Sequence, residues 1–423
     1  MQHSNEVIIV GAGIGGLTLA LTLHKAGIAC RIFEAAPEIK PLGVGINLLP
    51  HATSVLAELG LIDALAAVAV TTQESAFFNR HGQLIYREPA GRFAGYEQPQ
   101  FSIHRGDLQT VLLNAVLERL GADRVLTDRR CLGATANGQG VSVEFADRTG
   151  VSYRVDGAAL VACDGVHSVI RKQFYPDEGA PRYSGVNMWR GTIKAPPFLT
   201  GASMVRAGWL THGKMVIYPI RNNVDDAGNQ LVNWVAEIEA PQPAKRDWNG
   251  AGRLADFFPA FADWHFDWLD VAAMIESSEA IYEYPMVDQD PLPRWTFGRI
   301  TLLGDAAHPM VPRGSNGAGQ AILDAQYLAQ RCAELGVSEA ALMAYDHARV
   351  KATGDVVLMN RKAPPDRILQ VIYERTQGER FERIEDVASA AELSEIANQY
   401  KRVAGFHLDD LKNRGTAESG AAV

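Results

Sequence analysis

The chain has 423 residues, too many for one ordinary core, and this length predicts roughly two to three domains. Hydrophobic residues make up 47% and charged residues 21%, which is typical of soluble globular proteins and excludes disorder, collagen and coiled coil as descriptions of the whole chain. The 40 basic and 49 acidic residues give a net charge of −9, which argues against a broad nucleic-acid or anionic-membrane surface.

Cysteine usage and the apolar N-terminal run bear on location. The four cysteines are scattered and form no CxxC pair, so we expect neither a disulfide framework nor a zinc site, and we assign no metal site. The run 7–23 lacks a preceding basic region and is interrupted by four glycines, which is unlike a signal peptide or a membrane anchor. We therefore expect a cytoplasmic protein with no membrane or nucleic-acid partner.

The first third of the chain has the pattern of a parallel α/β unit. Glu6–Val10 is a short apolar run typical of a buried strand, Ile14–Lys25 has helical spacing, and Ile28–Phe33 is a second buried strand. Two further helices are expected, over Val55–Val68 and Asp107–Leu120.

The middle of the chain differs from both ends. Between Tyr183 and Tyr284 the pattern predicts strands, notably Met215–Ile220 and Leu231–Ile238, and all seven tryptophans fall between Trp189 and Trp295. This segment is expected to be an inserted β-rich binding domain.

The α/β pattern resumes after the middle segment. It predicts a strand over Ile300–Leu303 and helices over Gly317–Leu335 and Ala340–Asn360, with Pro364 and Pro365 breaking or redirecting the last helix. The residues from about Asn413 are small and polar and are expected to fray.

A glycine motif joins the first strand and helix. Residues 11–16 read GAGIGG, in which the first glycine suits a tight turn, the second admits a pyrophosphate and the third allows close helix packing. Alone the motif is weak, but Glu34 follows about 20 residues later at the end of the next strand, where a carboxylate accepts hydrogen bonds from a ribose. Together they predict a dinucleotide site.

Two later strands also end in Asp-containing turns. One runs into CDGVHS at 163–168, with Arg171 beyond it, and the other runs into GDAAHP at 304–309, followed by PRGSNG at 312–317. Taken singly, each could be an ordinary strand-to-helix connection with an Asx turn or an N-cap.

In this order, the three motifs resemble those of the para-hydroxybenzoate hydroxylase-like flavoprotein monooxygenases, which are FAD-dependent aromatic hydroxylases. The stretches PLGVGIN at 41–47, MWRG at 188–191 and YPMVD at 284–288 are closest to the phenazine-modifying (5-methylphenazine-1-carboxylate 1-monooxygenase-like) members. GSNG at 314–317 departs from the GxG of many other members.

The resemblance implies a fold and a division into domains. The expected fold class is α/β, a Rossmann-like FAD-binding domain with an inserted β-rich substrate domain and a helical C-terminal region. The FAD-binding domain is expected to comprise residues 1–72, 98–182 and 285–360, the substrate domain 73–97 and 183–284, and the C-terminal region 361–423.

The resemblance also implies which residues hold FAD. Glu34 would bind the adenosine ribose, Arg105 would lie near the pyrophosphate or ribose, and Asp305 would bind the ribityl hydroxyls. The helix starting near Gly317 would direct its N-terminus at the isoalloxazine and stabilise negative charge there. The full set of expected FAD residues is Gly11, Gly13, Ile14, Gly15, Gly16, Glu34, Ala35, Val44, Gly45, Arg105, Leu126, Asp164, Asp305, Pro312, Gly314, Asn316 and Gly317.

The family's reaction is implied in the same way. NADH or NADPH reduces the flavin, molecular oxygen forms a flavin C4a-hydroperoxide, and this species hydroxylates an electron-rich aromatic ring. No second GxGxxG motif serves the nicotinamide cofactor, and Asp164 and Arg171 are carried over as contributors to its binding. No side chain is assigned as an acid or base, and His308 is expected to pack or to hydrogen-bond locally.

The substrate is expected between the β-rich segment and the flavin. The candidate residues are Trp189, Arg190, Tyr218, Trp234, Tyr284, Pro285 and Met310, although each aromatic taken singly is as well explained by core packing. Arg190 should find an anionic partner, either a substrate carboxylate or a structural acid, and the sequence leaves these two open.

The sequence is compatible with three functions. The preferred one is hydroxylation of a heteroaromatic such as a phenazine-type carboxylate, with loss of the carboxylate. A flavin dehydrogenase or reductase without oxygen insertion, and a non-catalytic escort protein of related fold, are the alternatives. The sequence does not distinguish a monomer from a homodimer.

Overall fold

The computed structural model describes residues 5–41, 43–241, 250–362 and 364–411. The predicted fraying tail from Asn413 lies outside these residues. Within the described part of the chain, no helix is both long and apolar enough to cross a bilayer.

A six-stranded sheet forms the centre of the α/β part. Its strand order is β21-β22-β12-β1-β2-β8, and all neighbours are parallel except β21 and β22. The strands are β1 (Val7–Val10), β2 (Cys30–Phe33), β8 (Val125–Leu126), β12 (Ala159–Ala162), β21 (Thr296–Phe297) and β22 (Ile300–Leu302). All four residues of β1 and of β12 are buried, as expected of strands covered on both faces.

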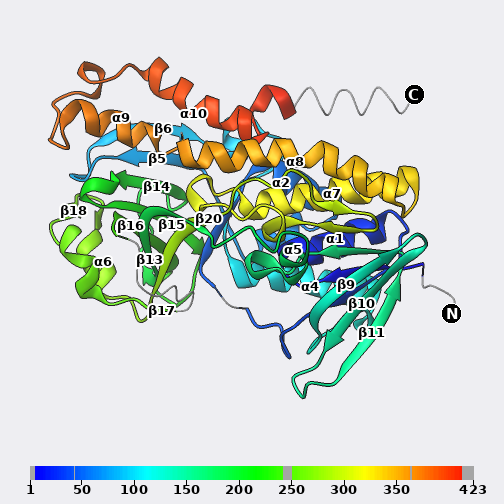
Figure 1. Cartoon of the computed structure of the whole chain (residues 1–423). Helices are drawn as coiled ribbons and strands as arrows, with labels where there is room; N and C mark the ends of the chain where they lie inside the picture. Colours follow the sequence, from blue (N-terminus) through cyan, green and yellow to red (C-terminus); the bar gives the residue numbers. More distant parts are fainter. Residues whose placement is uncertain (1–4, 42, 242–249, 363, 412–423) are drawn as a thin grey trace.

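Helices pack around this sheet. The glycine motif leads into α1 (Ile14–Lys25), which packs against α4 (Arg105–Leu120) and α7 (Gly317–Leu335), and α7 in turn packs against α8 (Glu339–Lys362) (Figure 1). The predicted helix over 55–68 was wrong in one respect. It forms two helices, α2 (Pro50–Glu58) and α3 (Ile62–Ala66), because the chain turns at Gly60, whose φ is +67°.

The β-rich part is an eight-stranded sheet with the order β17-β20-β13-β16-β15-β14-β5-β6. Its strands are β5 (Glu74–Phe78), β6 (Leu84–Pro89), β13 (Arg182–Ala195), β14 (Ser203–Gly208), β15 (Lys214–Arg221), β16 (Gln230–Glu239), β17 (Gly250–Ala251) and β20 (Ile281–Asp288). The early strands β5 and β6 therefore join the same sheet as the middle of the chain. The α/β fold with an inserted β-rich part and a helical C-terminal region is confirmed, whereas the domain boundaries stay a prediction.

Smaller elements complete the fold. Three minor sheets contain β3 (Gly45–Leu48), β4 (Val70–Thr71) and β7 (Phe101–His104); β9 (Arg130–Asn137), β10 (Gly140–Ala146) and β11 (Ser152–Gly157); and β18 (His265–Phe266) with β19 (Leu269–Asp270). The remaining helices are α5 (Val169–Phe174), α6 (Val271–Glu276), α9 (Arg367–Thr376) and α10 (Ala390–Ala404).

The eight-stranded sheet separates two environments, because successive side chains of a strand point to opposite faces. One face carries Trp189, Trp234 and Ile217, which are buried with Phe257 and Trp264 in an aromatic core. The other face meets the α/β part and, at the β5–β6 end, is covered by α9 and α10 (Figure 1).

A buried ionic cluster ties the C-terminal region to this second face. Lys214 donates to Glu237 at 2.9 Å and also to Asp366, the residue that precedes α9. Arg206 pairs with Asp366 at 3.2 Å, and the side chains of all four residues are less than 10% exposed. Two cations and two carboxylates thus balance one another where water is excluded.

Replacing Lys214 by Met would leave two buried carboxylates with Arg206 as their remaining cation. We expect the free energy of unfolding to fall by about 3–5 kcal/mol, because breaking a buried ion pair leaves an uncompensated charge. Urea denaturation measures this loss. Lys351→Met is the control, since the Lys351 side chain is 85% exposed and pairs only with Asp355. Equal losses in the two variants would contradict the assignment.

Candidate active site

The glycine motif has two kinds of glycine. At Gly11, whose φ is +100°, an added Cβ would lie 2.4 Å from the carbonyl oxygen of Cys163, and at Gly16 it would lie 2.0 Å from that of Gly11. The protein's own backbone therefore requires these two glycines. At Gly13, by contrast, an added Cβ would meet nothing within 4 Å, and no side chain caps the helix that starts after it. The N-terminus of α1 is thus open to a ligand.

Glu34 lies beside this open helix end, as the motif predicts. Its carboxylate accepts hydrogen bonds from the backbone N–H of Ala12 at 2.7 Å and of Ala36 at 2.8 Å. The N–H of Glu34 itself donates to the carbonyl of Leu126 at 2.8 Å, so Glu34, Ala35 and Leu126 share one corner of the sheet. Each carboxylate oxygen has a further lone pair, which suits a ribose hydroxyl.

Asp305 and Arg105 lie together farther along the same groove. Both line the main cavity, as does Gly45, and the N–H of Arg105 donates to the carbonyl of Val44 at 2.9 Å. Surrounding protein raises the pKa of the Asp305 carboxyl through desolvation, while the charges of His308 and Arg105 act in the opposite direction. The Asp305 side chain itself is exposed in the cavity wall, where a ligand can reach its carboxylate.

Three buried side chains, those of His308, Asp324 and Arg349, hold the loop that carries Asp305. His308 lies 2.6 Å from Asp324 through Nε2, Arg349 donates to Asp324 at 2.7 Å, and the N–H of Gly304 donates to it at 3.2 Å. Burial alone would raise the pKa of Asp324, but the charges of His308 and Arg349 outweigh it and hold that pKa below its usual value. His308 does not line the cavity, in agreement with the sequence interpretation that assigned it no catalytic role.

A second helix end faces the cavity. Asn316 precedes α7 and lines the cavity together with Pro312 and Gly317. No side chain caps α7, and Nδ2 of Asn316 is a buried donor without a hydrogen-bond partner among the described residues. A helix N-terminus carries roughly half a positive charge, so this end favours an electron-rich or anionic ligand edge.

The loop before α7 rests on the C-terminal helix, which the sequence analysis did not foresee. An added Cβ at Gly314 would lie 1.5 Å from the Tyr400 hydroxyl, which donates to Asn360 at 2.8 Å. His51 contacts Asn316 at 3.0 Å and stacks on Phe406. Gly314 therefore serves packing against α10 rather than direct access to a ligand.

The cavity between the two helix ends and the large sheet has a volume of about 330 Å³. Of the predicted FAD residues, its lining includes Gly13, Ile14, Gly15, Gly45, Arg105, Asp305, Pro312, Asn316 and Gly317. The others lie outside it: Glu34, Ala35 and Leu126 at the sheet corner, Val44 next to Arg105, and Gly11, Gly16, Gly314 and Asp164 in packing positions.

One wall of the cavity is formed by the large sheet, and every second side chain of its strands points into the cavity. Residues of β13, β14, β15 and β16 that point into it are Met188, Arg190, Met204, Arg206, Lys214, Val216, Tyr218, Val235 and Glu237. Arg190 and Tyr218 thus line the cavity as predicted, and so does Met310 from the loop after β22. Met204, Arg206, Lys214 and Glu237 had no motif to signal them. Only Lys214 could have been inferred from period-two spacing, because it shares β15 with Tyr218.

The prediction that Trp189 and Trp234 line the substrate pocket was wrong. Both are adjacent in sequence to cavity residues, and a strand turns adjacent residues to opposite faces. Trp189 stacks on Phe257, and the indole N–H of Trp234 donates to Ser278 at 2.8 Å, so both belong to the aromatic core. Tyr284 and Pro285 are absent from the cavity lining, although Tyr284 lies opposite the cavity residue Met188 and packs on an apolar cluster that includes Met188 and Met286.

The sequence left open whether the anionic partner of Arg190 is a substrate carboxylate or a structural acid, and the contacts of Arg190 bear on this choice. Its Nη2 donates to the carbonyl of Gly45 at 2.6 Å, and its buried Nε has no hydrogen-bond partner among the described residues. No Asp or Glu of the described chain forms an ion pair with it. The Tyr218 hydroxyl lies nearby; burial raises the pKa of Tyr218, and the charge of Arg190 partly opposes that shift. Among the described residues, the contacts of Arg190 are therefore with a backbone carbonyl and a tyrosine and not with a structural acid.

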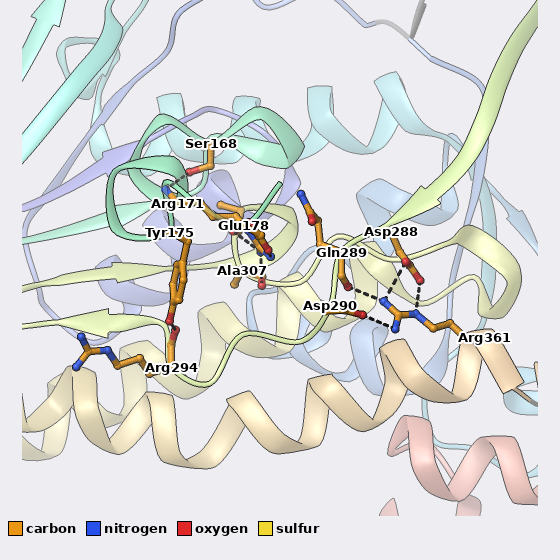
Figure 2. Close-up of polar contacts among 11 residues, drawn as sticks. Ser168, Arg171, Tyr175, Glu178, Asp288, Gln289, Asp290, Arg294, Ala307 and Arg361 are labelled. Carbon is orange, nitrogen blue, oxygen red and sulfur yellow. Dashed lines mark hydrogen bonds and ion pairs between the residues drawn. The ribbon is translucent and has the colours of Figure 1, made fainter. Parts of the chain in front are cut away.

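Arg171 and Asp164, the expected contributors to nicotinamide binding, both make contacts within the protein. Arg171 is buried, pairs with Glu178 and donates to the carbonyls of Ala306 and Ala307 at 3.1 and 2.7 Å (Figure 2). Asp164 accepts from the N–H of Val169 at 2.9 Å, and burial raises its pKa. Both hold the backbone of the site and do not line the cavity.

Comparison with known proteins agrees with this geometry. The family profile described as the FAD binding domain matches residues 4–360. The chain is 43% identical over 362 residues to the phenazine 1,6-dicarboxylic acid hydroxylase PhzS of Lysobacter antibioticus, covering 84% of this chain and 89% of that protein. It is 32% identical over 411 residues to the 3-amino-4-hydroxybenzoate 2-monooxygenase of Streptomyces cremeus, covering 95% and 96% of the two chains.

Solved structures share the fold. A salicylate hydroxylase in complex with substrate has a TM-score of 0.70 and 23% identity, covering 96% of this chain and 98% of that one. Klebsiella pneumoniae HpxO, solved with FAD and uric acid, has a TM-score of 0.72 and 21% identity, covering 96% of each chain.

Substitutions at Gly13 and at Gly16 are expected to impair different properties, namely FAD binding and stability. Gly13→Val should fold normally but lose FAD, with the dissociation constant raised at least about tenfold, because an added Cβ meets no atom of the described residues within 4 Å and would take space that the ligand needs. Gly16→Val is the matched control. Its side chain collides with the carbonyl of Gly11, so we expect a lower melting temperature. Flavin fluorescence titration and thermal melting separate the two effects, and full flavin retention in Gly13→Val would refute the assignment.

Proposed function

The chain belongs to the FAD-binding-domain family, and on this premise we propose that its substrate is a planar nitrogen heteroaromatic carboxylate of the phenazine type. The protein is a FAD-dependent monooxygenase of aromatic substrates that uses NADH or NADPH as co-substrate. The proposal concerns which ring it hydroxylates and how the protein holds it.

FAD suits the residues around the cavity. The open N-terminus of α1 at Gly13 would take the pyrophosphate, Glu34 the adenosine ribose, Asp305 the ribityl hydroxyls, and the N-terminus of α7 at Gly317 the isoalloxazine. Bound there, the flavin supplies the redox chemistry with oxygen, while the protein orients the substrate and excludes water.

The choice of an acidic substrate rests on one observation. The guanidinium of Arg190 lies in the cavity wall and has no carboxylate partner among the described residues. Arg190 is partly buried, and an arginine fork matches a carboxylate. Beside it on the wall lie Val235 and Val216, which pair in register and offer an apolar surface to a flat ring. A planar aromatic acid satisfies both features.

The proposed reaction replaces the ring carboxylate by a hydroxyl group. NAD(P)H supplies two electrons, one atom of molecular oxygen enters the ring and the other leaves as water, and the carboxylate departs as carbon dioxide with its bonding electrons left to the ring. The name of the relative from Lysobacter antibioticus supports a phenazine acid as the substrate. NAD(P)H is an intracellular reductant and the four cysteines are unpaired, which supports a cytoplasmic location.

Labelled oxygen distinguishes oxygen insertion from simple dehydrogenation. With phenazine-1-carboxylate and ¹⁸O₂, we expect NAD(P)H-dependent oxygen uptake, release of carbon dioxide and one labelled oxygen atom in the product. Oxygen uptake without label in the product would show that the flavin only oxidises NAD(P)H in the presence of that compound.

Arg190→Gln should weaken binding of the acid selectively. Loss of a charge-assisted hydrogen bond is worth about 1.5–3 kcal/mol, so we expect KM for the carboxylate to rise about 10- to 100-fold. The Kd for the uncharged ring without its carboxylate should change little. Steady-state NAD(P)H oxidation and ligand titration of the flavin spectrum measure the two. A similar weakening for both ligands would indicate a general packing role instead.

A further inference from the structure

A second hollow, here called the cationic groove, lies on the surface outside the main cavity. Its volume is about 610 Å³, and it is bounded by the start of β13, the ends of β14 and β16, and the connection from α8 to α9. The side chains that matter here are those of Trp209, Glu239, Arg313, Arg361, Lys362 and Arg367.

Its lining is strongly positive. Arg361 is neutralised by Asp288 at 2.7 Å and by Asp290 at 2.6 Å, as Figure 2 shows. Arg313, Lys362 and Arg367 have no ion-pair partner in the described part of the chain. Glu239 is the one acidic residue among the described lining. Arg182 lies 3.9 Å from Asp290, so Arg182 and Arg361 together balance the two aspartates. Arg313, Lys362 and Arg367 against Glu239 then leave two positive charges without compensation, in a protein whose net charge is −9.

The groove adjoins the flavin cavity. Arg313 lines both hollows, and its buried Nε has no hydrogen-bond partner among the described residues. Nearby, the side chain of Asn360 donates to the carbonyl of Val311 at 3.3 Å, which ties the end of α8 to the loop that carries Arg313. The side chain of Arg313 would thus separate a ligand in the groove from a flavin in the main cavity.

We propose that the cationic groove binds the pyrophosphate of NADH or NADPH. Lys362 and Arg367 hold the phosphates, Arg313 lies between them and the flavin cavity, and the half-buried indole of Trp209 offers a face on which a base can stack. Separate cations around one open groove match a polyanion better than a single carboxylate. This inference rests on the NAD(P)H-dependent activity and not on the identity of the aromatic substrate.

An exposed groove also suits a ligand that must leave after each turnover. Lys362 is exposed, and Arg313 and Arg367 are partly exposed, so their attraction for phosphate is screened by salt. Arg171, which is buried, and Asp164, which is partly buried, were carried over for this role from the family resemblance, and both bond to the backbone.

The FAD-loaded enzyme provides the test. Anaerobic stopped-flow reduction of the flavin by NADH and by NADPH gives an apparent Kd and a limiting rate for each. We expect Lys362→Glu combined with Arg367→Glu to raise the apparent Kd at least about tenfold, with the limiting rate changed less than about twofold. Added salt should raise the Kd of the unaltered enzyme more than that of the variant. Preference for NADPH over NADH would identify the 2′-phosphate as a further contact.

Two controls keep the result interpretable. Lys351→Glu reverses a charge earlier on α8, outside the groove, and should leave the Kd unchanged. If the double variant does not fold, Lys362→Ala alone should still raise the Kd, because it removes an exposed side chain that has no ion-pair partner among the described residues. An unchanged Kd in a variant with full flavin content would overturn the proposal. So would a rise confined to KM for the aromatic acid, which would assign the groove to substrate entry. Because flavin reduction is followed without any aromatic substrate, a wrong substrate leaves this outcome unaffected.

Discussion

The site depends on one buried carboxylate, that of Asp324. It lies on α7, accepts from Arg349 of α8, contacts His308 and accepts from the N–H of Gly304, and so it holds the Asp305 loop against two helices. This anion can be buried because the Arg349 guanidinium compensates its charge and further groups bond to it within hydrogen-bond distance. With this anchor in place, α7 points its N-terminus at the cavity, and Asp305 stands in the cavity wall. Asp324 thus positions the start of the Asp305 loop, while the loop before α7 is supported separately by Tyr400 and His51.

The sequence predicted the α/β half well because its signals are local. A buried strand, a glycine turn, a helix and Glu34 follow one another within one βαβ unit, and the predicted helix over Gly317–Leu335 has the observed bounds. The cavity wall was harder to predict. Attention to aromatic residues selected Trp189 and Trp234, whereas the period of the strand places their neighbours Met188, Arg190 and Val235 in the cavity. Alternation was a better guide than residue type.

Contacts between distant segments were beyond sequence reasoning. Nothing near Lys214 indicates Asp366, and nothing near Gly314 indicates Tyr400, because these pairs form only after the C-terminal region folds back over the large sheet. The same holds for the cationic groove, whose residues come from β14, the loop before α7 and the α8–α9 connection. A motif is a pattern within one segment of the chain, whereas a pocket is formed by residues from several segments.

The packing of Tyr400 on Gly314 also has a consequence for biogenesis. The loop that faces the cavity lies near residue 314, yet its support comes from α10, which ends at Ala404. Chains are synthesised from the N-terminus, and N-terminal parts fold first. The nucleotide-binding unit can therefore form on the ribosome long before the loop at the other end of the cofactor has its support. Maturation of the holoenzyme is in this way coupled to completion of the polypeptide, and a prematurely terminated chain would keep the glycine motif but lack the support of the α7 loop.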